Sequence, residues 1–277
     1  MKRALPKVAL GLVALALACE IPALLPVDRD AGRTEAGKAD AAPDAPEAGA
    51  PDATDGGSCE SAIFCEDFDK GSWNKEFWSG PPPNSGGTIE VDTSKAHSGA
   101  ASLHFHNPAR PDGGTAQTAL GRPTFNYRDF YLRAFVWVPP FPAAPGGGES
   151  FLTLNRQDGQ TGIFLTRYDT LAAQAFYGTN GFETRVTNGK LSDPAAWDCL
   201  ELHVSLNGAG VPNLALWVRG VDQSPAPFTN AIVLDPVGGL ELGVVIGNQV
   251  APYPAQDLWV DDVILDTVRI GCDRPAH

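Results

Sequence analysis

Hydrophobic and polar residues alternate along several short stretches of the chain with the two-residue period of a β-strand. In residues 131–138 (YLRAFVWV) every second side chain is aliphatic or small, and the intervening side chains are aromatic or basic. The same scheme recurs in LELHV at 200–204 and in LALWV at 214–218. Such alternation is typical of strands that bury one face. Further strands, less regular in pattern, are predicted at residues 163–168, 232–234, 240–246 and 258–270.

Turn-forming residues separate these stretches. Glycine, proline and asparagine cluster at 146–148, 179–181, 188–189, 207–208 and 238–239. Gly99 also predicts a turn, with a strand beginning at Ser102. No window keeps a helical period over three turns. Many short strands with turn signals between them indicate a sandwich or a barrel, and we predict an all-β, two-sheet antiparallel sandwich for residues 58–277.

The N-terminal pattern is different. Lys2, Arg3 and Lys7 precede an apolar run at residues 8–18, which is too short to span a bilayer but has the length of a signal-peptide core. The run ends in Leu-Ala-Leu-Ala-Cys19, which resembles the bacterial lipobox. That resemblance implies cleavage after residue 18, acylation of Cys19 and anchoring in a lipid bilayer. In a lipoprotein, an Asp directly after the acylated cysteine would retain the protein in the inner membrane. The residue at this position is Glu20, which favours the outer membrane or cell surface.

Composition changes again at residues 19–57. This stretch is rich in Ala, Pro, Gly, Asp and Glu, has no aromatic residue and carries a net charge of −6. Such a segment cannot bury enough apolar surface to offset its ordering entropy, so we predict a disordered linker. The chain as a whole has a net charge of −13, and residues 58–277 account for −10 of it. An acidic domain is unsuited to nucleic acid, whose phosphates require clustered Lys and Arg.

Several motifs of the domain follow one another in a familiar order. FCEDFDKGSWNKEFW, VDTSKAHSGAASLHF, FYLRAFVWV, WDCLELHVSLNG, LALWVRG and LWVDDVILDTVRIGC extend from about residue 62 to 272. Together they resemble concanavalin A-like jelly-roll domains, including carbohydrate-binding modules, laminin-G-like domains and polysaccharide lyases. The motifs are short and are shared by binding proteins and enzymes, so they bear on the fold more than on the function.

The resemblance implies a structural calcium ion between the first and last strands. The matching acidic residues are Glu66 or Asp67 in the first strand and Asp261 or Asp262 in the last. We take Glu66 and Asp262 as the metal ligands, since calcium prefers carboxylate and carbonyl oxygens. The alternative is that these acids are edge-strand charges that discourage aggregation.

Five cysteines leave four after Cys19: Cys59, Cys65, Cys199 and Cys272. An exported domain lies where disulfides persist, and four cysteines allow three pairings. We favour Cys59–Cys65 with Cys199–Cys272. Cys59–Cys272 with Cys65–Cys199 is nearly as good, because the first and last strands of the resembling folds are antiparallel. No cysteine and histidine keep the spacing of a zinc site.

If the apolar positions of each strand face the core, the other positions form a polar and aromatic face. Aromatic rings stack on sugars, while amides, carboxylates and guanidinium groups hydrogen-bond sugar hydroxyls. We therefore predict carbohydrate binding. The candidate ligand-binding residues are Tyr131, Arg133, Phe135, Asn155, Tyr168, Glu201, His203 and Trp217.

An enzymatic alternative is a polysaccharide lyase in which Arg133 neutralises a uronate and His203 and Tyr168 act as base and acid. The Gln-x-His and Tyr-x-Lys-x-Gly motifs of such lyases do not occur, nor does the Glu-x-Asp-x-x-Glu strand of glycosidases on this fold. A structural or adhesive envelope protein without a small ligand is the third hypothesis. The expected protein is thus an exported, lipid-anchored carbohydrate-binding lipoprotein.

Overall fold

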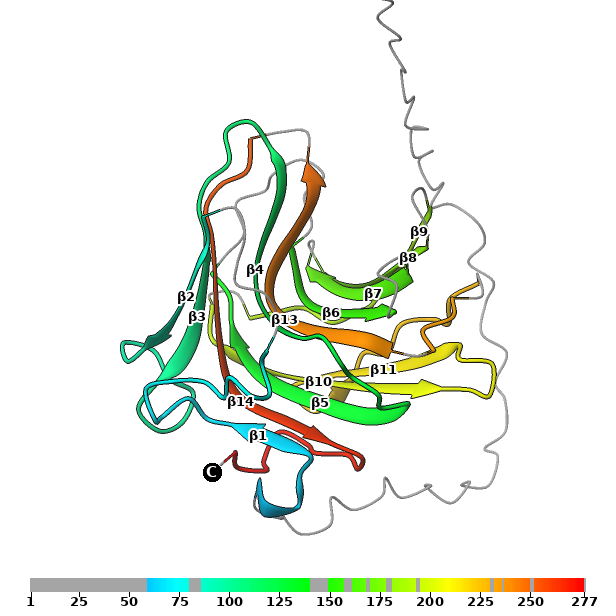
Figure 1. Cartoon of the computed structure of the whole chain (residues 1–277), viewed down its shortest axis with the longest axis horizontal. Coiled ribbons are helices and arrows are strands. Elements are labelled where there is room, and N and C mark those ends of the chain that lie inside the picture. Colours follow the sequence, from blue (N-terminus) through cyan, green and yellow to red (C-terminus); the bar gives the residue numbers. More distant parts are fainter. Residues whose placement is uncertain are drawn as a thin grey trace, which may run out of the picture. The chain divides into compact units, whose positions relative to one another are not determined.

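The computed structural model of the chain divides into two compact units, Met1–Ala48 and Gly49–His277. The described residues all lie in the second unit (Figure 1). They are 59–79, 86–139, 149–156, 161–167, 170–177, 181–192, 195–229, 232–235, 237–249 and 252–276. The predicted signal peptide, Cys19 and the predicted linker lie outside them. No helix among the described residues is long and apolar enough to cross a lipid bilayer.

Two antiparallel β-sheets make up the described part, as the alternation predicts, and it contains no α-helix. A 3₁₀ turn at Cys59–Ser61 (η1) opens it. The first sheet has eight strands in the order β12-β11-β10-β5-β14-β3-β2, with β1 also paired to β14. These strands are β1 (Phe64–Glu66), β2 (Thr88–Asp92), β3 (Ser102–Asn107), β5 (Asp129–Trp137), β10 (Trp197–Leu206), β11 (Pro212–Val218), β12 (Val221–Asp222) and β14 (Gln256–Asp266).

The second sheet has six strands in the order β4-β13-β6-β7-β8-β9. They are β4 (Gly114–Arg122), β13 (Val237–Gln249), β6 (Glu149–Arg156), β7 (Thr161–Arg167), β8 (Leu171–Tyr177) and β9 (Gly181–Val186). This sheet is strongly curved: β4 and β13 rise on one side, β8 and β9 turn up on the other, and the face turned away from the eight-stranded sheet lies inside the curve (Figure 1).

The core lies between the two sheets. Leu132 of β5 and Leu202 of β10 come from the eight-stranded sheet, and Leu152, Leu165 and Leu242 come from the six-stranded sheet; all five are buried in one cluster. The alternate side chains of each strand point away from this core, because successive residues of a strand face opposite sides. The alternation in 131–138, 200–204 and 214–218 therefore identifies the core face correctly.

Several details differ from the sequence prediction. The strand predicted at 258–270 ends at Asp266 as β14. Residues 232–234, predicted as a strand, are not part of a sheet; Ile232 and Leu234 are buried, and the Leu234 N–H donates to the Gly210 carbonyl at 3.0 Å. They fill the core without joining a ladder. Gly238 and Gly239, predicted to break the chain, lie inside β13. The predicted turn at Gly99 is present, with a φ of 60°, and β3 begins at Ser102.

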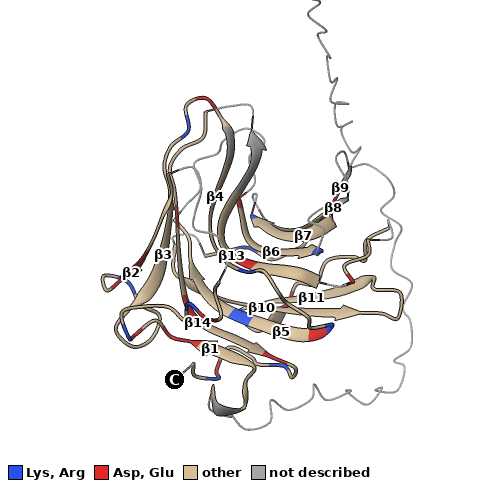
Figure 2. Ribbon diagram, viewed as in Figure 1, with Lys and Arg blue, Asp and Glu red and all other residues tan. Residues whose placement is uncertain are grey.

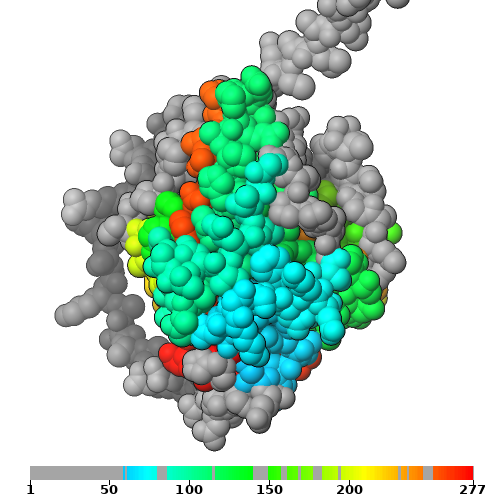
Figure 3. Space-filling model, turned by 60° about the vertical axis from the view of Figure 1, so that its left-hand side comes forward, coloured from blue at the N-terminus to red at the C-terminus, as the bar shows by residue number. Residues whose placement is uncertain are grey.

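Both favoured disulfides are present. Cys59 is bonded to Cys65, and Cys199 at the start of β10 is bonded to Cys272 in the segment that follows β14. In the space-filling view the cyan segment around β1 lies beside the teal part of the chain (Figure 3), and the Ala100 N–H in the turn before β3 donates to Asp69 at 2.6 Å. β1 itself pairs with β14, so the first and last strands are antiparallel neighbours.

Candidate functional site

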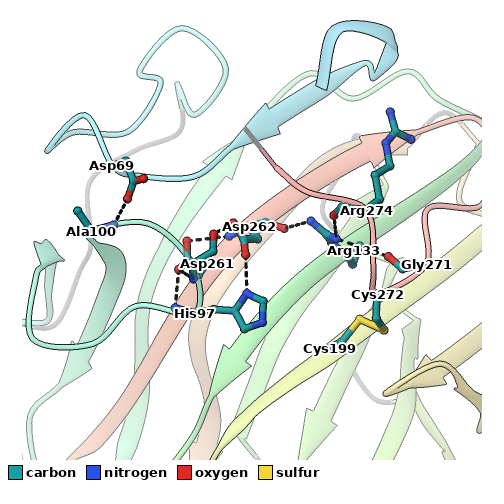
Figure 4. A network of polar contacts seen from close by, with 11 residues as sticks. Asp69, His97, Ala100, Arg133, Cys199, Asp261, Asp262, Gly271, Cys272 and Arg274 are labelled. Atoms are coloured by element: carbon teal, nitrogen blue, oxygen red, sulfur yellow. Dashed lines mark hydrogen bonds and ion pairs between the residues drawn. A yellow bond between two sulfur atoms is a disulfide. The ribbon is translucent and has the colours of Figure 1, made fainter. Parts of the chain in front are cut away.

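The middle of the outer face of the eight-stranded sheet is covered by the chain itself. Residues 267–276, which we call the tail, follow β14, and the Cys199–Cys272 disulfide bonds the tail to β10. Arg133 of β5 lies beneath it, 1% exposed, and its guanidinium donates to the backbone carbonyls of Asp262 at 3.0 Å and of Arg274 (Figure 4). Burial lowers the pKa of Arg133 to about 10, so it remains protonated at neutral pH.

Glu201 of β10 has a matching role. Its carboxylate, 1% exposed, accepts hydrogen bonds from the backbone N–H groups of Ile270 at 2.7 Å and Gly271 at 3.1 Å. Phe135 is buried under the imidazole of His97, with the ring centroids 3.4 Å apart. The prediction that Arg133, Phe135 and Glu201 are displayed to a ligand is therefore wrong, because the tail and the turn before β3 occupy that face.

Three other predicted ligand-binding residues do come together on this sheet. Tyr131 stacks on His203, with centroids 4.1 Å apart, and lies 6.3 Å from the Trp217 ring. His203 contacts Asp129 at 2.7 Å, and the Arg269 guanidinium lies 4.4 Å from the centre of the Trp217 ring. Burial, then Asp129 and Glu201, raise the pKa of Tyr131. This half-buried aromatic strip keeps some exposed surface, although Arg269 occupies one face of Trp217.

The two acids expected to bind calcium accept hydrogen bonds from different parts of the chain. Glu66 accepts the backbone N–H of Asn74 at 2.7 Å. The Asp262 carboxylate contacts Nδ1 of His97 at 2.5 Å and accepts the Ser98 hydroxyl at 2.8 Å (Figure 4). Asp262 has a φ of 49° at an irregularity of β14, and this bulge turns it toward the same loop as Asp261.

Protein donors thus satisfy oxygens of both predicted calcium ligands. Within the described residues, the grouping of three or more metal-ligating side chains includes neither Glu66 nor Asp262. Burial, then the neighbouring Asp262, raise the pKa of Asp261 to about 7, so hydrogen bonding and protonation relieve part of the repulsion that a cation would otherwise neutralise.

The outer face of the six-stranded sheet carries aromatic and amide side chains inside the curve. Phe164 of β7 and Phe176 of β8 are partly buried and stack with centroids 4.8 Å apart and an interplanar angle of 21°. Phe176 lies over Gly162, where an added Cβ would be 2.2 Å from the ring. Gly162 pairs with Asn155 of β6, the one predicted ligand-binding residue on this sheet that the structure describes. Tyr168 lies outside the described residues.

The neighbouring row of side chains on this face is polar. Glu241, Thr153, Phe164 and Gln174 are successive partners across β13, β6, β7 and β8. Burial raises the pKa of Glu241, while a hydrogen bond from the Gln117 side chain opposes the rise. The Thr153 hydroxyl is buried and has no hydrogen-bond partner. An unpaired buried hydroxyl beside a desolvated carboxyl is unfavourable unless something else binds there.

This face, which we call the Phe164–Phe176 face, is defined by Asn155, Gly162, Phe164, Gln174, Phe176, Thr153, Glu241 and Gln117. The charged residues of β6 and β7 are confined to the strand ends, Glu149, Arg156 and Arg167, and β8 has none (Figure 2). Sequence reasoning found only Asn155 here. The alternation in LAAQAFY could have revealed Gln174 and Phe176, but not which sheet they belong to.

Comparisons with known proteins identify the fold. No family model matches the chain, and no curated protein matches it. Among solved structures, the cellulose-induced protein Cip1 has a TM-score of 0.51 and 18% identity, over 76% of this chain and 99% of its own. The endo-β-1,4-glucuronan lyase of Trichoderma reesei has a TM-score of 0.57 and 15% identity, over 78% of this chain and 99% of its own. The fold is a concanavalin A-like jelly roll. At this identity the likeness concerns the fold alone, and function must be argued from the site.

Proposed function

We propose that the jelly-roll domain binds a polysaccharide on the Phe164–Phe176 face. The observation that carries the proposal is the stacked, partly buried aromatic pair on the inside of a curved sheet, flanked by the amides of Asn155 and Gln174. Binding sites for organic ligands combine aromatic surface with a few placed polar groups. Aromatic rings give a flat apolar surface for a pyranose, and amides both donate to and accept from hydroxyls. The glucuronan lyase of the same fold acts on a polysaccharide, which supports this ligand class.

The charge of the face favours a neutral sugar. Its described outward-facing residues include one carboxyl, Glu241, and no Lys or Arg. A uronate bound here would place its carboxylate near Glu241 without a cation, and burying unpaired like charge is costly. The preferred ligand is therefore an uncharged polysaccharide.

The lyase alternative has less support. Arg133, the expected uronate partner, is buried under the tail, and His203 lies on the other sheet from the Phe164–Phe176 face. On the described part of that face, no cation is combined with an acid and a base. Incubation with polyuronates while following the absorbance of unsaturated uronate tests this directly, and turnover would favour the lyase.

Binding is tested by isothermal titration or affinity electrophoresis with neutral and uronic polysaccharides. Phe164→Ala and Phe176→Ala should each weaken binding by about tenfold, equivalent to about 1.4 kcal/mol. Trp217→Ala, an aromatic change on the other sheet, is the matched control and should leave affinity unchanged. The opposite pattern would transfer the site to the Tyr131–His203–Trp217 strip. No binding by the wild type to any glycan would favour a structural or adhesive role.

We further propose that the domain is exported and anchored through acylated Cys19. The basic start, the apolar run and the Leu-Ala-Leu-Ala-Cys19 sequence support this, and the two disulfides suit an oxidising compartment. Labelled palmitate should be incorporated by the wild type and not by Cys19→Ser. Persistent labelling of Cys19→Ser would refute acylation at this residue.

Structural calcium stays a prediction. The residues present fit the ion poorly, because Asp262 and Glu66 already accept protein donors. If calcium does bind, chelation should lower the thermal midpoint and Asp262→Ala should abolish that response, since a ligand of the folded state stabilises it. An unchanged midpoint in chelator would leave the hydrogen bonds to His97 and Ser98 as the whole role of Asp262.

A further inference from the structure

A second group of polar side chains lies on the outer face of the eight-stranded sheet, away from both the tail and the Phe164–Phe176 face. His104 and His106 are two residues apart on β3, so both point away from the core, while Leu103 and Phe105 are buried. Asp257 of β14 pairs directly with His106. Glu90 of β2 pairs with His104 on the other side. Three adjacent strands thus bring two imidazoles and two carboxylates to one patch.

The nitrogen atoms converge on one carboxylate. His104 Nε2 and His106 Nδ1 each lie 2.8 Å from Oδ1 of Asp257. The three ligand atoms all lie within 4.8 Å of one another. Two imidazole nitrogens and a carboxylate oxygen form the donor set that first-row transition metals accept.

One of the histidines is held in a fixed orientation. The His104 ring stacks on the Trp259 indole, with centroids 4.2 Å apart and an interplanar angle of 6°. The indole N–H of Trp259 in turn donates to Asp92 at 2.7 Å. Nδ1 of His104 lies 3.4 Å from the Glu90 carboxylate. A carboxylate on the remote nitrogen of a ligating histidine fixes its tautomer and orientation in known metal sites.

We propose that His104, His106 and Asp257 bind a divalent transition-metal ion, with Zn²⁺ the best fit. His104 contributes Nε2, His106 contributes Nδ1 and Asp257 contributes a carboxylate oxygen, and Glu90 positions His104. On a tetrahedral ion, ligand atoms are roughly 3.3 Å apart. The pairs that now lie 2.8 Å apart need to open by only about half an ångström, which side chains at this partly exposed surface can do.

These ligand atoms do not suit calcium, the ion predicted to bind at Asp262 of the same strand. Calcium takes six to eight oxygen ligands, whereas this group offers two nitrogens. Zinc would bind the two ring nitrogens that now contact Asp257, with the proton of each neutral imidazole on its other nitrogen, and the two carboxylates would offset its charge. Three protein ligands leave a fourth position for water or another ligand.

The test uses the purified full chain without a histidine tag, titrated calorimetrically with ZnCl₂. One zinc ion per chain is expected. His106→Ala and Asp257→Asn should each weaken binding by at least about tenfold, the lower end of what perturbed metal shells lose. His203→Ala removes a histidine of the same sheet outside the group and should have no effect.

A second readout protects the test against misfolded variants. Zinc should raise the thermal midpoint of the wild type and of His203→Ala, because it binds the folded state, and at the same zinc concentration should raise that of Asp257→Asn less. Equal affinity in wild type and Asp257→Asn would overturn the proposal, as would the absence of binding at millimolar zinc. The result is independent of the polysaccharide site, since no residue is shared.

Discussion

Replacing Arg133 by methionine separates a structural role from a ligand-binding role. Methionine has a similar length and apolar stem, so the change leaves little cavity and removes mainly the guanidinium. That group donates to the carbonyls of Asp262 and Arg274 and lies 3.5 Å from the carbonyl of Gly271. All three acceptors belong to β14 or to the tail. Their hydrogen bonds hold the tail against the sheet.

The cost follows from the contacts. Two well-made charged hydrogen bonds are lost, and each buried acceptor left without a donor costs about 1–3 kcal/mol. Asp262 and Glu201 also lose a nearby cation that offsets their charge. The free energy of unfolding should fall by about 3–5 kcal/mol, as for other buried charge networks that lose one partner. For a domain of this size that is roughly 10 °C in thermal midpoint.

Urea unfolding at neutral pH, followed by circular dichroism and tryptophan fluorescence, measures the loss. Arg128→Met is the matched control: Arg128 pairs with Asp235 but its side chain is 46% exposed, so its loss should cost about 1 kcal/mol or less. Folded Arg133→Met should bind polysaccharide as the wild type does. If Arg133→Met unfolds at the wild-type midpoint but no longer binds polysaccharide, the structural role is refuted and Arg133 is again a ligand-binding residue.

Three further outcomes are expected. Replacing Cys199 and Cys272 by serine should lower the free energy of unfolding by about 4 kcal/mol, because the disulfide closes a loop of 73 residues. Urea unfolding midpoints measure this loss, and an unchanged midpoint would contradict it. Burial raises the pKa of Glu149 to about 7 from its ordinary 4.5, so the folded state holds the extra proton and stability should fall as pH rises from about 4.5 to 7. Glu149→Gln should make the pH dependence of the free energy of unfolding shallower. An unchanged slope would show that other groups cause this pH dependence. Gly162→Ala should displace Phe176, costing about 1–3 kcal/mol by overpacking and weakening polysaccharide binding; wild-type affinity in this variant would separate Phe176 from the site.

The fold was accessible from the sequence wherever one face of a strand is apolar and the other polar. Residues 131–138 show this, and they became β5 with Leu132 in the core as predicted. β8 was missed because two of its core positions, Ala173 and Ala175, are small, and Ala172 is buried on its outward side as well. Gly239 is typical of a turn between strands, yet it lies inside β13 and pairs with Asn155. A sheet tolerates glycine where neighbouring backbones approach closely.

The candidate sites were less accessible, because alternation separates the two faces of a strand without saying what covers each face. Arg133 and Phe135 alternate with core residues as ligand-facing residues would, yet the tail and the His97 loop bury them. The contact between Arg133 and Asp262 joins residues more than a hundred positions apart in sequence, and Phe135 meets His97 across several intervening elements. His104 and Asp257 are likewise distant in sequence and adjacent only through the pairing of β3 with β14.

The position of β14 has a consequence for the order in which the protein can form. β14 is the shared partner of β1, β3 and β5, so the eight-stranded sheet lacks its central member until residues 256–266 are available. During synthesis from the N-terminal end, the earlier strands emerge with unpaired edges before β14 is available. The Cys59–Cys65 bond can close early, whereas the Cys199–Cys272 bond cannot form until Cys272 is available. Loop closure over such distances is slow, and a chain interrupted before β14 would expose strand edges that favour aggregation.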